Sequence, residues 1–381
     1  MTSTVSNRLP GPSLLAFGAA VLAFTTFSAP AAQAAGCGTA LSSGRHDLTI
    51  MSGGVEREAV YYVPSSYDGK RKLPLVFDFH GSNSHPDGQL NRSHWNEVAE
   101  REGFMVMALQ GSLDGSFEGS HAWNVPGVNP LPGVSTDNGL DEPRFIKDAV
   151  QHAKDNFCVD PARVYATGYS GGGRMLSQFI CNGNPEFAAA GFVMGLRAGY
   201  PEQEDGVWRP RADSCKPSKP ISIIAFSGLK DDVNPFSGGG KPYWQYGGKV
   251  ALGRWAELNG CNMKPMTSEG DKLSVSTYSA CRNDASVTSY VIADAGHAWP
   301  SQRVRFQLAS TGDEPMREVD TTGRMWEFFR NSGGGLLAGA PAKADCPTAS
   351  ETTGDKTGGQ GKTCSQSASR DNSAPKVVGD L

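Results

Sequence analysis

A serine at position 170 lies in the middle of a Gly-x-Ser-x-Gly pattern that spans residues 168–172. The residues before the pattern are β-branched and aromatic, as in a strand, and a helix is expected over about 174–181. A sharp turn from strand to helix lifts the hydroxyl of such a serine clear of the sheet. Gly168 and Gly172 approach each other so closely in this turn that a Cβ would collide. The pattern therefore predicts that Ser170 is a nucleophile.

A serine hydroxyl is a weak nucleophile until a base takes its proton, and the base needs an acid to fix its tautomer. In chains with this turn the order is serine, then acid, then histidine. His297 is the one histidine of seven that follows both Ser170 and a plausible acid. Asp231 and Asp232 both follow an expected strand at 221–226. We choose Asp231 as the acid and keep Asp232 as the alternative.

The oxyanion that forms after serine attack needs two fixed hydrogen-bond donors. We expect these to be the backbone N–H of Gly171 and that of Ser82, with Gly81 as the alternative to Ser82. His80, just before this loop, is expected to form structural hydrogen bonds rather than to act as a second base. Four further residues near expected strand ends are candidates for a substrate pocket, although core packing explains them equally well: Trp299, Phe236, Trp123 and Met194.

Composition and charge argue against several classes of function. The formal net charge of −4 over 381 residues offers no basic face, so nucleic acid is not an expected partner. No pair of cysteines has the spacing of zinc ligands, and we expect neither a metal nor a cofactor. The expected partner is a polymer or small-molecule substrate, and a monomer is favoured.

The first 35 residues are expected to be a signal peptide. They contain Arg8, a short apolar stretch at 14–24 and a small-x-small cleavage site at 32–34. The apolar stretch is too short to span a bilayer, so no stable membrane insertion is expected. Cys37 leaves a lipid anchor open as an alternative, but cleavage near residue 35 and a free, secreted or periplasmic product are favoured.

Residues 36–331 are long enough for one large catalytic domain. Residues 332–381 are rich in Gly, Ala, Ser and Thr and are expected to form a flexible low-complexity tail. All eight cysteines follow the expected signal peptide, and an even number suits disulfides in an oxidising compartment. The first-choice pair is Cys261 with Cys281, followed by two weaker choices, Cys181 with Cys215 and Cys346 with Cys364.

The elements that must position these residues alternate along the chain. An initial hairpin over 46–51 and 56–63 is closed by a Ser-Gly-Gly turn. Strands are expected at 73–79, 104–109, 189–194, 221–226 and 287–293, and helices at 90–102, 141–157, 246–259 and 321–331. Alternating strands and helices predict an α/β fold with a mostly parallel, doubly wound sheet.

Taken together, these motifs resemble the secreted esterase family that contains feruloyl esterases and polyhydroxybutyrate depolymerases. The resemblance covers about residues 37–331 and rests on Phe157-Cys158-Val159-Asp160 before the serine strand, Gly228-x-x-Asp231 with Pro235, and Gly296-His297-x-Trp299-Pro300. It implies an α/β-hydrolase fold with a nucleophile elbow and a triad of Ser170, Asp231 and His297. Two departures are Ser227, where the family usually has histidine, and a third elbow glycine, Gly173.

The chain is also similar overall to the bacterial oxidised poly(vinyl alcohol) hydrolases, which cleave β-diketones. The same triad and oxyanion hole could cleave an ester or a β-diketone. In both reactions a protonated histidine can deliver its proton to the leaving group, which is an alkoxide in one case and an enolate in the other. The expected function is therefore a secreted serine hydrolase that acts on a polymer or its fragments through an acyl-enzyme. The narrowest expectation is hydrolysis of β-diketone groups in oxidised poly(vinyl alcohol). The alternative is a carboxylic-ester hydrolase such as a feruloyl esterase or polyhydroxybutyrate depolymerase.

Overall fold

The computed structural model describes residues 1–2, 36–126, 136, 138–300 and 319–332. Residues 3–35 of the expected signal peptide, the tail beyond residue 332 and the Cys346–Cys364 pair lie outside the described residues. Within the described ranges, no helix is both long enough and apolar enough to cross a membrane.

A ten-stranded sheet forms the centre of the domain. Across the sheet the strands are β1 (Gly44–Ser52), β2 (Val55–Val63), β4 (Met105–Leu109), β3 (Leu73–Phe79), β7 (Val159–Tyr169), β8 (Ala189–Val193), β11 (Ser222–Gly228), β14 (Val287–Ile292), β13 (Leu273–Tyr278) and β12 (Met266–Glu269). The neighbouring strands from β4 to β14 run parallel, and antiparallel strands extend the sheet at both edges. This topology confirms the α/β fold with a mostly parallel, doubly wound sheet.

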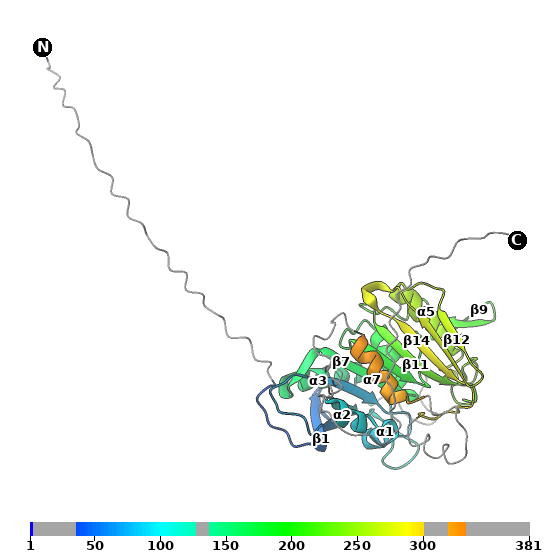
Figure 1. The fold of residues 1–381 in the computed structure, drawn as a ribbon, viewed down its shortest axis with the longest axis horizontal. Coiled ribbons are helices and arrows are strands. Elements are labelled where there is room, and N and C mark those ends of the chain that lie inside the picture. Colours follow the sequence, from blue (N-terminus) through cyan, green and yellow to red (C-terminus); the bar gives the residue numbers. More distant parts are fainter. Residues whose placement is uncertain (3–35, 127–135, 137, 301–318, 333–381) are drawn as a thin grey trace, which may run out of the picture. The chain divides into compact units, whose positions relative to one another are not determined.

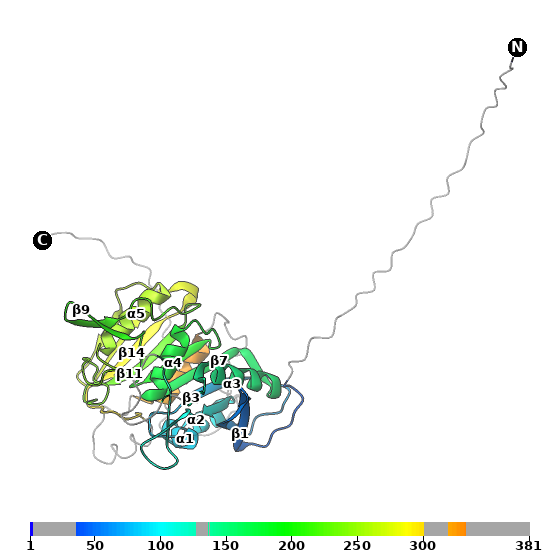
Figure 2. The same cartoon turned by 180° about the vertical axis from the view of Figure 1, so that it is seen from behind.

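Helices cover both faces of the sheet (Figures 1 and 2). On one face lie α1 (Pro86–Ser93), α2 (Trp95–Glu102) and α7 (Thr321–Asn331), whose apolar side chains share one buried cluster. On the other face lie α3 (Glu142–Asn156), α4 (Gly171–Cys181) and α5 (Gly248–Asn259), which contribute to a second cluster. Parallel strands buried on both faces need continuous apolar sequence, and every residue of β3 is buried.

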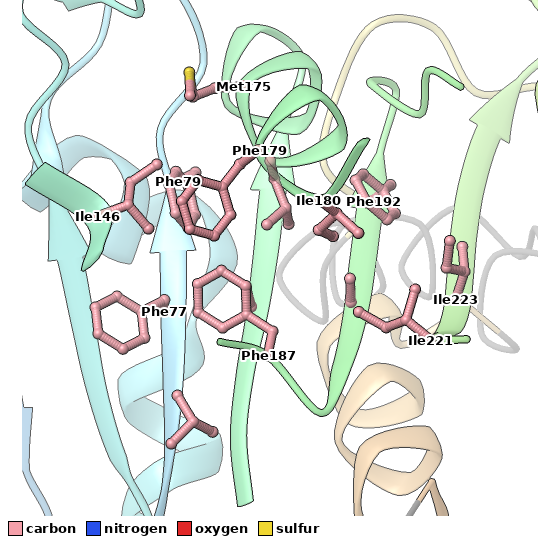
Figure 3. Packing of buried hydrophobic residues seen from close by; sticks show 14 of the residues in the cluster. Phe77, Phe79, Ile146, Met175, Phe179, Ile180, Phe187, Phe192, Ile221 and Ile223 are labelled. Carbon is pink, nitrogen blue, oxygen red and sulfur yellow. The ribbon is translucent and has the colours of Figure 1, made fainter. Parts of the chain in front are cut away.

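Aromatic side chains fill the space between the sheet and helix α4 (Figure 3). The ring of Phe187 lies 5.7 Å from that of Phe77 on β3 and 5.7 Å from that of Phe179 on α4. Phe79 packs edge-on to the same ring. The start of α4 lies beside the carboxyl end of β3, because a Cβ on Gly172 would collide with the backbone carbonyl of Phe79.

Two expected helix boundaries are wrong. The single helix expected over 90–102 is two helices, because His94 has a left-handed backbone with φ 55° that ends α1 before α2 begins. Helix α4 begins at Gly171 rather than at Arg174, because close packing overrides the low helix propensity of the elbow glycines. The sequence also did not predict the short pairs β5 (Leu113–Asp114) with β6 (His121–Ala122), and β9 (Pro201–Glu204) with β10 (Val207–Pro210).

Three disulfides stabilise the described domain. The expected pairs Cys261–Cys281 and Cys181–Cys215 are confirmed. The third, Cys37–Cys158, was not predicted, and it joins the start of the domain to the residue before β7. Because the sulfur of Cys37 is bonded to that of Cys158, it is not available for a lipid anchor. Disulfides of this number indicate an oxidising compartment.

Candidate active site

Loops at the carboxyl ends of β7, β11 and β14 bring three polar side chains into one hydrogen-bonded chain. Nε2 of His297 lies 2.9 Å from Oγ of Ser170. Nδ1 of the same ring lies 2.8 Å from Oδ2 of Asp231. The carboxyl ends of parallel strands are where open α/β sheets place their ligand sites. This arrangement has the geometry in which an imidazole can accept the proton of a serine hydroxyl.

Ser170 occupies a strained turn between β7 and α4. Its backbone has φ 48° and ψ −111°, a conformation that a residue with a side chain rarely adopts. The surrounding glycines make this turn possible: a Cβ on Gly168 would lie 2.6 Å from the nitrogen of Gly173. Gly173 in turn faces the backbone of Gly195, since its own Cβ would lie 2.9 Å from the Gly195 Cα. The close approach of Gly195 thus explains the third elbow glycine.

Asp231, and not Asp232, contacts the histidine. Its side chain is almost fully buried, whereas Asp232 is exposed. The second carboxylate oxygen, Oδ1, accepts the backbone N–H groups of Val233 at 3.0 Å and Asn234 at 2.8 Å. The amide of Asn234 donates to the carbonyl of Met194 at 2.6 Å. These bonds fix the carboxylate so that Oδ2 faces the imidazole.

The loop of His297 is held by Tyr169, the residue just before the serine. The hydroxyl of Tyr169 donates to the backbone carbonyl of His297 at 2.8 Å, and the two rings lie 5.3 Å apart. Burial raises the pKa of Tyr169, so its hydroxyl stays a donor. Tyr169 is a site residue that was not predicted, although it is the aromatic residue within the Gly-x-Ser-x-Gly pattern.

The two expected oxyanion donors lie next to each other. A Cβ on Gly171 would lie 2.9 Å from the backbone nitrogen of Ser82, so the two loops almost touch. The Ser82 loop turns through Asn83, which has φ 60°. An isolated antiparallel bridge between Ser84 and His121 then joins this loop to β6. The loop of Ser82 therefore lies directly against the first residue after the serine.

His80 lies beneath this loop and is fully buried. Its Nε2 accepts the backbone N–H of Gly111 at 2.9 Å, and its Nδ1 contacts the carbonyl of Gly81 at 2.8 Å. Burial lowers the pKa of His80 to about 3, so the ring is neutral. A neutral ring with both nitrogens bonded agrees with the expected structural role.

Three of the four candidate pocket residues lie in the buried core. Trp299, Trp123 and Met194 are at most 5 % exposed and belong to the buried clusters. The indole N–H of Trp123 donates to His80, and that of Trp299 donates to Thr322. Phe236 is partly exposed and packs against Gly248.

No cluster of three or more His, Cys, Asp or Glu side chains that could hold a metal occurs within the described part of the chain.

No family model matches the chain. Among curated proteins, it is 28% identical over 327 residues to feruloyl esterase C of Emericella nidulans, an alignment that covers 84% of this chain and 96% of that protein. It is 29% identical over 250 residues to feruloyl esterase B of Piromyces equi, covering 64% of this chain. The chain is similar in sequence to feruloyl esterases, and its strand order and elbow are those of an α/β-hydrolase. The resemblance expected from the motifs is thereby confirmed.

The match to feruloyl esterase B spans only 42% of that protein's length. Among solved structures, an acetyl xylan esterase from Aspergillus awamori aligns with a TM-score of 0.45 and 14% identity, over 69% of this chain and 97% of that one. The fold assignment of this α/β-hydrolase rests on its own strand order and elbow.

Proposed function

We propose that this α/β-hydrolase is an exported serine hydrolase that cleaves carboxylic esters through an acyl-enzyme. The observation that carries the proposal is the hydrogen-bonded chain from Ser170 through His297 to Asp231. The export is supported by the three disulfides.

In the proposed reaction, Nε2 of His297 takes the proton of Ser170 as Oγ attacks the ester carbonyl carbon. The negative charge that develops on the carbonyl oxygen is stabilised by the backbone N–H groups of Gly171 and Ser82. The tetrahedral intermediate expels the alcohol, which receives the proton from His297, and leaves an acyl group on Oγ. Water, deprotonated by the same histidine, then attacks the acyl carbonyl carbon. The bond from this carbon to Oγ breaks, Oγ takes the proton back from His297, and the carboxylic acid is released.

An ester is favoured over a β-diketone because the curated relatives are named for feruloyl esters. Feruloyl esterases B and C align over much of this chain at 28–29% identity. We therefore propose a feruloyl or similar ester, free or attached to a polymer, as the substrate. Cleavage of β-diketones in oxidised poly(vinyl alcohol) requires the same machinery and is the competing proposal.

A substrate panel separates the two proposals. The purified protein is assayed with methyl ferulate, a hydroxybutyrate oligomer and a 4,6-diketone, with Ser170→Ala as the control for each. We expect turnover of at least one ester at a kcat/KM well above that for the diketone, and no turnover by the variant. Turnover of the diketone alone would overturn the ester proposal, and equal activity of Ser170→Ala would overturn the serine mechanism.

A further inference from the structure

Arg174 lies on the first turn of α4, four residues after the serine, and its backbone N–H donates to the carbonyl of Ser170 at 3.1 Å. Its side chain is turned inward and the residue is only 6 % exposed. The Nη2 atom lies 3.4 Å from Oγ of Ser82, the residue whose N–H is the second proposed oxyanion donor. The guanidinium stacks at 4.0 Å over the ring of Tyr243.

This buried cation has no carboxylate partner among the described residues. Its Nε and Nη1 atoms are inaccessible to solvent and have no hydrogen-bond partner in the described part of the chain. Burial lowers the pKa of Arg174 from its ordinary value, and the neighbouring Tyr243 partly opposes that shift. Burying a charge without a partner costs free energy of folding. An unpaired buried arginine therefore suggests a functional role, because it does not stabilise the fold.

The other buried arginines are used for structure. Arg57 forms a 2.8 Å ion pair with Glu142. Arg197 directs its two Nη atoms at the backbone carbonyls of Tyr246 and Trp244. Arg174 differs because its side chain contacts the hydroxyl of Ser82 and the side chain of Tyr243 instead. No acid among the described residues pairs with its positive charge, which lies beside the loop of the second proposed oxyanion donor.

We propose that Arg174 is a positioning residue for the oxyanion hole. Its guanidinium holds the Ser82 loop through the hydroxyl of Ser82, and it places an uncompensated positive charge behind the developing oxyanion. The proposal rests on the proposed serine-hydrolase function and deepens it. A preorganised charge in a site that excludes water stabilises a transition state without reorganisation during the reaction.

The first test replaces Arg174 with methionine and with lysine. In Arg174→Met, kcat for an activated ester should fall roughly 10- to 100-fold, less than for loss of a direct oxyanion donor, while KM changes little. The melting temperature should stay the same or rise, because an apolar side chain of similar length removes the unpaired buried charge. Arg174→Lys keeps the charge and should recover most of the lost kcat.

The matched control is Arg197→Met, since this arginine is equally buried but bonded to backbone carbonyls. We expect this variant to lose stability while its kcat stays within about threefold of the wild-type value. A structural role for Arg174 would make the two methionine variants behave alike, with a lower melting temperature and little effect on kcat.

The second readout is inhibition by phenylboronic acid, which forms a tetrahedral anionic adduct with the serine. Its inhibition constant should weaken in Arg174→Met by about the same factor as kcat. An unchanged kcat and inhibition constant in Arg174→Met, or failure of the lysine variant to recover activity, would overturn the proposal. If wild-type protein hydrolyses no ester and binds no boronate, the proposed function fails as well, whereas an active wild type with unaffected variants refutes this inference alone.

Discussion

Replacing Asp231 with asparagine should reverse the tautomer of His297. Oδ1 of Asp231 accepts two backbone N–H groups, from Val233 at 3.0 Å and from Asn234 at 2.8 Å. An amide NH₂ cannot occupy that position, because it would face two donors. The oxygen of the new amide must therefore take the place of Oδ1, and its NH₂ must point at Nδ1 of His297 in place of Oδ2.

The consequence for catalysis is large. An NH₂ that donates to Nδ1 leaves the proton of the neutral imidazole on Nε2, so Nε2 of His297 can no longer accept the proton of Ser170. The same reversal in a serine protease triad lowers kcat about 10⁴-fold. At about 1.36 kcal/mol for each factor of ten, this corresponds to roughly 5 kcal/mol of lost transition-state stabilisation. The shape of the side chain is unchanged, so stability should change little.

The assay is kcat for p-nitrophenyl acetate together with the melting temperature of each variant. Asp232→Asn is the matched control, because the neighbouring carboxylate is exposed. We expect Asp231→Asn to lose about 10⁴-fold in kcat and Asp232→Asn to remain close to wild type. Retention of more than a tenth of the activity by Asp231→Asn, or an equal loss in Asp232→Asn, would refute the tautomer argument.

Three further changes are predicted. Tyr169→Phe removes one hydrogen bond to the His297 loop, worth about 0.5–1.5 kcal/mol, so kcat should fall by up to about tenfold, and an unchanged kcat would contradict this. Removing the Cys181–Cys215 disulfide, which closes 34 residues, should lower the urea-derived free energy of unfolding by about 4 kcal/mol, and no loss of stability would count against it. Burial raises the pKa of Asp78 to about 7. The folded state therefore binds a proton that the unfolded state releases near pH 4, and stability falls as the pH rises towards 7. Asp78→Asn should remove this part of the pH dependence of the melting temperature, and parallel curves for the two proteins would exclude it.

Chain order and local sterics made much of the site predictable. Ser170, Asp231 and His297 were chosen because each follows an expected strand and because their order suits one topology. The structure brings these three side chains into contact. The parallel strands at the centre of the sheet were also predictable, since β3 and the second half of β7 are buried runs that end at turn residues, whereas the edge strands β12 and β13 were not predicted. The site residues and the strands were predictable because each depends only on one strand and the turn that follows it.

The remaining features depend on contacts between distant segments. Cys37 and Cys158 are 121 residues apart, and nothing in their spacing favours one pairing over another. The hydrogen bond from Tyr169 to the His297 loop joins residues 128 apart. The helix break at His94 requires a left-handed backbone that histidine rarely adopts, so helical periodicity alone predicted continuity.

Burial also could not be deduced for the aromatic candidates. Trp299 and Trp123 lie near strand ends, where an aromatic residue is equally expected in a pocket wall and in the buried core. In the structure both side chains belong to the core, and each indole N–H donates to a buried partner within the domain.

The most direct measurement for the central claim is covalent labelling with a fluorophosphonate, followed by peptide mass spectrometry to locate the adduct. The proposed mechanism predicts one phosphonyl group per chain, on the hydroxyl of Ser170. It also predicts that labelling is lost in Ser170→Ala and strongly slowed in His297→Ala, with both variants folded. A folded, ester-cleaving wild-type protein that is not labelled at Ser170, or that is labelled at another residue, would contradict it.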